Sequence, residues 1–157
     1  QIGYSIINEI RKNIADELDY YIERSKEIRF DLEVIYTILR DDEKFLSVLI
    51  EVSQYFGTAY PNYWVETVNF GYNPIRKLDI RDVLNVNVVD FLKDAIGLYC
   101  EADCKNFLLD CINEDSIQDI EFSITKEKLI LYLYKLLPHA LTAAGLIEVP
   151  LNPDIKI

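Results

Sequence analysis

The chain is poor in the residues on which most catalytic and cofactor sites depend. It contains one histidine, His139, and five glycines in 157 residues. None of the glycines lies in a Gly-rich turn that opens a helix, so neither nucleotide-binding fingerprint is present. His139 follows Pro138 in an apolar stretch, where a lone histidine is more often a hydrogen-bonded core or edge residue than a general base. We therefore predict no catalytic residue and no cofactor, and the sequence favours a non-enzyme over an enzyme.

Cysteine is also scarce, and its spacing does not favour a metal site. Cys100, Cys104, Cys111 and His139 have the right chemistry for a zinc ion. On one continuous helix, however, Cys100 and Cys111 would lie about 16 Å apart along the axis, whereas the sulfur ligands of one zinc ion lie within about 4 Å of one another. We expect no metal. Three cysteines in a chain of this size indicate reduced thiols and a cytoplasmic location.

Positive charge is the third deficit. Lys and Arg total 16 against 27 Asp and Glu, which gives a formal net charge of −11. Phosphate backbones and anionic membrane surfaces would repel such a protein, so we predict neither nucleic acid nor membrane as a partner. The most apolar stretch, 129–147, is interrupted by Lys135, which argues against a membrane span.

What the chain does have is a concentration of aromatic rings in residues 55–72, which hold seven rings, including the only tryptophan. Gly57, Pro61 and Gly71 prevent a continuous helix there. Rings in such a segment either plug a core or form a surface for a partner or ligand. The subset that we expect to be exposed and to bind a partner is Tyr60, Tyr63, Trp64 and Tyr72.

The hydrophobic pattern predicts an all-α fold, a single-domain helical bundle of five to seven helices. Apolar residues from Ile6 to Leu39 fall within one half of a helical wheel, which indicates a helix with a break near Ser25. Residues 28–34 also alternate like a strand, but the helical stripe passes through them. Asp41 or Asp42 would then cap a helix over 43–56.

The second half of the chain shows the same period. We predict a short helix over 80–84, a helix with apolar positions from Val88 to Ala102, a break at Asp103 and a further helix over 104–112. Residues 117–124 are expected as a loop or short strand. Thr125 would cap a last, central helix with apolar positions on every side, from Leu129 to Leu141.

These elements give one domain over 1–157, made of a helical block at 1–56, an aromatic connector at 57–74 and a helical block at 75–157. Within the connector, alternation of side chains predicts a small β-hairpin near residues 63–70.

Acidic residues gather between Asp94 and Glu121, where eight carboxylates face a single base, Lys105. Such a run is either a solvated face or a patch that steers a basic partner. The residues that we select from it as candidate partner contacts are Asp94, Glu101, Asp110, Glu114 and Asp115.

Three hypotheses for function follow. The first is a non-enzymatic interaction module, of the inhibitor, immunity or adaptor type, that docks a basic protein through its acidic face and aromatic segment. The alternative is a small-molecule-binding regulator or an unfamiliar enzyme, with a pocket lined by residues 55–72 and with His139 or a buried carboxylate as its polar group. The third is a homo-oligomeric structural protein, a homodimer that pairs through the first helix.

Overall fold

The computed structural model describes residues 31–55, 61–100, 104–138 and 145–156. The chain divides into two units, residues 1–33 with 53–63 and residues 34–52 with 64–157. Only 31–33, 53–55 and 61–63 of the first unit are described, so the account below concerns the second. The first predicted helix up to residue 30, and with it the homodimer hypothesis, lies outside the described residues. The candidate residues Tyr60, Glu101 and His139 also lie outside them, as do Gly57 and the predicted helix break at Asp103.

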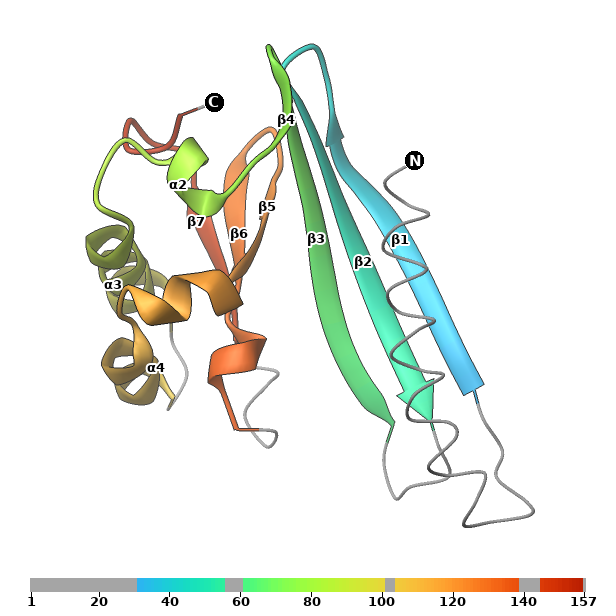
Figure 1. Cartoon of the computed structure of the whole chain (residues 1–157). Coiled ribbons are helices and arrows are strands. Elements are labelled where there is room, and N and C mark those ends of the chain that lie inside the picture. The colour runs from blue at the N-terminus through green and yellow to red at the C-terminus, as the bar shows by residue number, and fades with distance from the viewer. Residues whose placement is uncertain (1–30, 56–60, 101–103, 139–144, 157) are drawn as a thin grey trace, which may run out of the picture. The chain divides into compact units, whose positions relative to one another are not determined.

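Seven strands in the described residues form two antiparallel sheets (Figure 1). The first sheet has the order β1-β2-β3-β4, with β1 at Asp31–Asp41, β2 at Phe45–Tyr55, β3 at Asn62–Tyr72 and β4 at Ile75–Lys77. The second sheet has the order β5-β6-β7, with β5 at Glu121–Ile124, β6 at Lys128–Tyr132 and β7 at Leu146–Pro150.

The described helices lie between β4 and β7 in the chain. They are α2 (Ile80–Val83), α3 (Val88–Tyr99), α4 (Lys105–Cys111) and the 3-10 turns η1 (Asp115–Asp119) and η2 (Tyr134–Leu136). The helices predicted over 80–84 and from Val88 are confirmed, and α3 and α4 are separate helices. The longest of them, α3, has 12 residues, and no helix in the described part of the chain combines the length and apolar character needed to cross a membrane.

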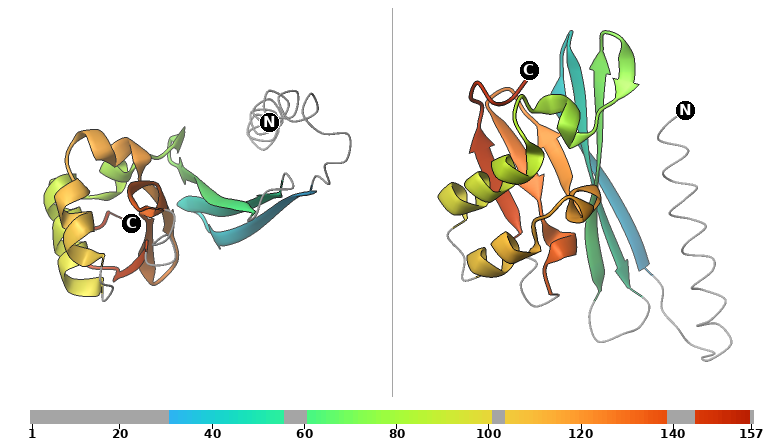
Figure 2. Two further views of the ribbon diagram at one scale, coloured as in Figure 1. Left: turned by 90° about the horizontal axis from the view of Figure 1, so that it is seen from below. Right: turned by 60° about the vertical axis from the view of Figure 1, so that its left-hand side comes forward.

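The main core lies between the second sheet and these helices, which cover one of its faces (Figure 2). β6 is the central strand, and its fully buried Leu129 and Leu131 belong to the same hydrophobic cluster as Leu92 of α3. The other face of β6 carries Ile130 and Tyr132, which pack against Val65 of β3. Because β6 is covered on both faces, it does not show the alternation of apolar and polar residues that is typical of a half-buried strand. Its residues from Leu129 to Tyr132 are all buried.

The prediction of an all-α helical bundle is therefore wrong. Strands take up about 46% and helices about 28% of the described residues. β1 and β2 replace the helices expected over 28–39 and 43–56, and β6 and β7 replace the expected central helix. The helical blocks at 1–56 and 75–157 are corrected accordingly wherever the chain is described. The hairpin predicted near 63–70 is corrected: these residues belong to the single strand β3, which pairs with β4 through residues 70–72 and 75–77. The single-domain organisation stays a prediction.

Two predicted helix caps turn out to be turn residues. The Oδ1 of Asp42 accepts the backbone N–H groups of Lys44 and Phe45 at 2.9 and 3.0 Å in the β1–β2 turn. The Oγ1 of Thr125 accepts those of Glu127 and Lys128 at 3.1 and 3.0 Å in the β5–β6 turn. A short polar side chain that accepts backbone N–H groups two or three residues ahead stabilises a turn as well as a helix start. The prediction that these side chains accept backbone N–H groups is therefore confirmed, but the prediction that they begin helices is wrong.

Candidate functional site

A groove between α3 and the segment that follows β7 is the first candidate site. We call it the α3 groove; its volume is about 380 Å³. One face of α3 forms one wall. Val149 of β7 and residues 152 and 154, which follow β7, form the other. The lining residues are Val86, Asn87, Asp90, Phe91, Asp94, Ala95, Leu98, Tyr99, Val149, Asn152 and Asp154.

The face of α3 that lines the groove follows from the helical period. Asn87, Asp90, Asp94 and Leu98 recur every three or four residues, so they share one face along the helix. Asn87 caps the helix by accepting the Asp90 backbone N–H at 3.1 Å. Asp90 lies in the first turn, where the helix dipole favours a negative charge. The groove face is therefore fixed by a well-capped helix.

The opposite wall is held by backbone hydrogen bonds to the residues before α3. The N–H of Asn85 donates to the carbonyl oxygen of Asp154 at 2.7 Å, and the Asn85 side-chain amide donates to the carbonyl of Pro153 at 2.9 Å. Lys156 donates its N–H to the carbonyl of Val83 at 2.7 Å. Residues 153–156 are thus hydrogen-bonded to the end of α2 and to the residues before α3, and these bonds fix the position of the Asp154 backbone.

The electrostatic character of the α3 groove is one-sided. Asp90, Asp94 and Asp154 contribute three exposed carboxylates, and no Lys or Arg is among its lining residues. Apolar surface lies beside them: the exposed fraction is 74% for Leu98 and 41% for Tyr99. Carboxylates next to exposed apolar carbon match the two parts of a lysine or arginine side chain, the charged head and the aliphatic stem.

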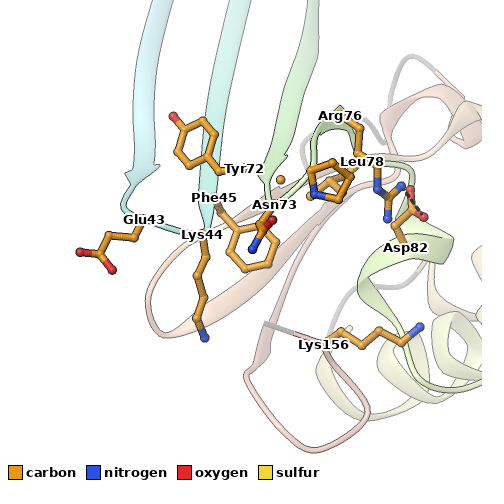
Figure 3. A pocket seen from close by; sticks show the side chains of 11 residues that line it. Glu43, Lys44, Phe45, Tyr72, Asn73, Arg76, Leu78, Asp82 and Lys156 are labelled. Carbon is orange, nitrogen blue, oxygen red and sulfur yellow. Dashed lines mark ion pairs between the residues drawn. The ribbon is translucent and has the colours of Figure 1, made fainter.

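A second concavity lies where the β1–β2 and β3–β4 turns approach α2. We call it the hairpin pocket; its volume is about 540 Å³ (Figure 3). Its lining includes the cationic Lys44, Arg76 and Lys156, and it meets the aromatic segment at Gly71 and Tyr72. Unlike the α3 groove, it mixes both signs of charge.

Arg76 is already engaged in this pocket. Its Nη1 lies 2.8 Å from the Oδ1 of Asp82, on α2 (Figure 3). Partial burial raises the pKa of Asp82, but hydrogen bonds from the Asp79 backbone and from Arg76, with the charge of Lys156, outweigh it and hold this pKa below the usual range. The carboxylate stays ionised and keeps Arg76 paired, which leaves Lys44 and Lys156 as the cations able to meet a ligand.

A polar cluster could be mistaken for a catalytic constellation. It consists of the buried Ser47, Thr67 and Asn69 and the partly buried Glu121. Ser47 donates its hydroxyl to the Asn69 Oδ1 at 2.7 Å, and Thr67 donates both its N–H and its hydroxyl to the Glu121 Oε2 at 3.1 and 2.7 Å. Lys135 pairs with the Glu121 Oε1 at 3.0 Å. The rest of their hydrogen bonds go to the backbone of β5. Each group serves to join β2 and β3 to β5, and none of the four is among the lining residues of the α3 groove or the hairpin pocket.

The candidate aromatic residues lie apart from the α3 groove. Tyr63 is 54% exposed and Trp64 is partly exposed, both on β3. Tyr72, at the end of β3, lines the hairpin pocket and donates its hydroxyl to the Asp41 Oδ1 at 3.2 Å. Desolvation and the neighbouring Asp41 carboxylate raise the pKa of Tyr72. Of these rings, only Tyr72 meets a described concavity.

The candidate acidic residues are also spread over several elements. Asp94 lines the α3 groove, whereas Asp110 lies on α4 and Asp115 on η1. Glu114 lies 3.9 Å from Arg81 in an exposed pair. Asp90 and Asp154 also line the α3 groove but were not selected from the sequence. Asp90 could have been selected, because it lies four residues before Asp94 and therefore on the same helix face. No local pattern in the sequence links Asp154 to α3.

The cysteines do not form a metal centre in the described residues. Cys100 and Cys104 are buried and Cys111 is partly buried. Within residues 31–55, 61–100, 104–138 and 145–156, no three His, Cys, Asp or Glu side chains are grouped so as to hold a metal ion.

Comparisons with known proteins bear on the fold. No protein-family model matches the chain, and no curated protein matches its sequence. The chain resembles a DUF3298 structure. That protein, a DUF3298 family member from Bacteroides fragilis, matches over 95% of this chain with a TM-score of 0.52 and 12% sequence identity. The chain spans 62% of the length of that structure. At this identity the likeness concerns the fold alone, and it agrees with the mainly β architecture.

Proposed function

We propose that this protein is a non-enzymatic interaction module that docks a basic protein partner in the α3 groove. The observation that carries the proposal is the charge of the groove. Asp90, Asp94 and Asp154 surround apolar surface with no Lys or Arg among the lining residues. A lysine or arginine of a partner can place its stem on Leu98 and Tyr99 and its head among these carboxylates.

The exposure of the carboxylates sets the expected strength of binding. An exposed ion pair contributes roughly 0.2–1 kcal/mol, and ionic strength screens it. The two or three pairs that the groove offers therefore give modest affinity by themselves, and the apolar contacts supply the rest. Charge complementarity mainly raises the association rate, so binding should weaken as salt is added.

A matched pair of double variants tests this proposal. Asp94→Asn with Asp154→Asn removes two charges from the groove, and Asp110→Asn with Asp115→Asn removes two charges elsewhere on the acidic surface. The probe is the acetylated, amidated peptide Thr-Lys-Val-Arg-Val-Lys-Thr, with its dissociation constant measured by NMR titration at low salt. We expect the groove variant to weaken binding about three- to tenfold and the other variant to change it less than about twofold. Equal losses in both variants would mean that only the net charge of the protein matters.

A small-molecule-binding regulator is the second candidate, and the hairpin pocket is the observation in its favour. The pocket reaches the aromatic segment at Tyr72, and its lining also includes the cations Lys44 and Lys156 and the ring of Phe45. These groups suit a small ligand with a ring and an anionic group. A fragment screen by NMR tests it, with shifts confined to Lys44, Tyr72 and Lys156 as the supporting result and shifts elsewhere as the contrary one.

A further inference from the structure

We propose that the basic partner binds in an extended conformation, as a strand added to the outer edge of β7, which no described strand covers, with alternate side chains directed into the α3 groove. This inference rests on the proposed function and specifies how the partner binds. It follows from the register of the second sheet, from the position of β7 at its edge and from the continuity of β7 with the groove.

Backbone hydrogen bonds at the two ends of the sheet show which residues of β7 bond to β6. The N–H of Leu151 donates to the carbonyl of Glu127 at 3.0 Å, and the N–H of Leu133 donates to that of Gly145 at 2.6 Å. Both belong to the ladder that pairs Leu131 with Ile147. In an antiparallel pair, hydrogen-bonded residues alternate with residues whose backbone groups point away. Odd-numbered residues of β7 therefore bond to β6.

The even-numbered residues of β7 point outward. Leu146 and Glu148 each present an N–H and a C=O at the edge, and Pro150 presents a C=O alone. No backbone partner for these outward groups is found among the described residues. The strand order β5-β6-β7 places β7 at an edge (Figure 1), and an extended peptide can add to such an edge through main-chain hydrogen bonds.

The same strand forms part of the groove wall. Val149 of β7 lines the α3 groove, and so do Asn152 and Asp154, which follow β7 directly. Successive side chains of an added strand point to opposite faces of the sheet. Those on the helix-covered face would lie against α3, near Asp90 and Asp94. Main-chain bonds to β7 would then supply affinity, and the groove would select basic residues at alternate positions.

Charge identifies the occupant as a basic segment of another protein. A second copy of this chain could pair its β7 with this one, but each copy carries a net charge of −11. Antiparallel pairing about the centre of β7 would place two Glu148–Lys128 ion pairs side by side, so the repulsion between two copies comes from their net charge rather than from Glu148 itself. A basic strand at the same edge would instead be attracted by the negative charge of the protein.

Amide exchange in the complex tests strand addition separately from basic-partner binding. The probe is again the peptide Thr-Lys-Val-Arg-Val-Lys-Thr, at a saturating concentration, with exchange followed residue by residue in the labelled protein by NMR. We expect the amide protons of Leu146 and Glu148 to exchange at least about tenfold more slowly in the complex. Those of Ile147 and Val149, already bonded to β6, should change little. The control peptide carries N-methyl groups throughout its central five residues and should give no protection.

The outcomes separate the two proposals. If Asp94→Asn with Asp154→Asn weakens binding but Leu146 and Glu148 are not protected, the basic partner is correct and strand addition is wrong. If the N-methylated peptide binds as tightly as its parent, main-chain pairing is likewise overturned. If neither the groove variant nor the edge amides respond to the peptide, both proposals fail.

Discussion

The two edge strands of the β5-β6-β7 sheet, β5 and β7, differ in how their outward backbone groups are hydrogen-bonded. An edge strand exposes backbone N–H and C=O groups that invite another strand to pair with it. At β5 the outward N–H groups of Phe122 and Ile124 and the carbonyl of Phe122 bond to side chains of the first sheet, whereas at β7 no described backbone group pairs with the outward groups. The difference shows which edge can accept a partner strand without disturbing the fold.

The closed edge depends on polar side chains from β2 and β3. The Asn69 amide donates to the carbonyl of Phe122 at 2.7 Å, and the N–H groups of Phe122 and Ile124 donate to the hydroxyls of Thr67 and Ser47 at 3.3 and 3.0 Å. These polar side chains are buried. Because side chains occupy every one of these positions, another strand could add to β5 only after the first sheet had separated from it.

The largest expected difference between the edges is in amide exchange of the free protein. The N–H groups of Phe122 and Ile124 are bonded and buried, so they should exchange only after local or global unfolding. Those of Leu146 and Glu148 face outward and should exchange without it. We expect the β5 amides to exchange about a thousandfold more slowly, as measured by hydrogen exchange with NMR detection. Similar rates at the two edges would remove the basis of the comparison.

Opening the closed edge should reduce stability strongly. Asn69 is 2% exposed, and Asn69→Ala removes the donor to the Phe122 carbonyl and the acceptor of the Ser47 hydroxyl. Leaving these buried groups unsatisfied should lower the free energy of unfolding by about 2–4 kcal/mol, measured by urea denaturation. The control is Asn106→Ala on the exposed face of α4, which should change it by less than about 0.5 kcal/mol. Equal effects would show that the cluster does not hold β5.

The helices were the part of the fold that sequence reasoning could find. The stripe of α3 is regular, Asn87 caps it, and its buried residues follow the spacing expected for one helix face. Asp94 could be selected as a binding residue because it lies in a local excess of acidic residues. Helical contacts are set within a few residues of the chain, so a window of the sequence contains the information that determines them.

The two sheets are held together by residues that are far apart in the sequence, so local sequence patterns did not predict them. Leu129 to Leu133 form a continuous apolar run because β6 is buried on both faces, and periodicity cannot distinguish such a strand from a buried helix. Ser47 and Thr67 meet the backbone of β5 from 77 and 55 residues away. The groove could not be predicted for the same reason. Asp154 and Asp94 line it together only because residues 153–156 are hydrogen-bonded to residues 83–85, beside α2 and α3.

The turn residue that was mistaken for a helix cap gives the last test of the closed edge. Arg40 is 9% exposed and donates to the carbonyl of Thr125 at 3.2 Å, just beyond β5, and its Nε lies 2.6 Å from the Oδ2 of Asp42. The backbone N–H of Lys44 and the Arg40 side chain lower the pKa of Asp42 from 3.8 to about 2. Asp42 therefore orients the side chain that closes this end of the edge.

Because this pKa is depressed in the folded protein, ionised Asp42 contributes stability above about pH 4 and loses it as the pH falls toward 2. We expect Asp42→Asn to lower the urea midpoint at pH 5 and to differ less from the unmodified protein at pH 2, where about half of the folded molecules of the unmodified protein have lost the Asp42 charge. The matched control is Glu43→Gln in the same turn, whose side chain is exposed. It should leave the midpoint at pH 5 nearly unchanged. A constant difference between Asp42→Asn and the unmodified protein across this pH range would mean that the carboxylate charge does not help to hold Arg40 against β5.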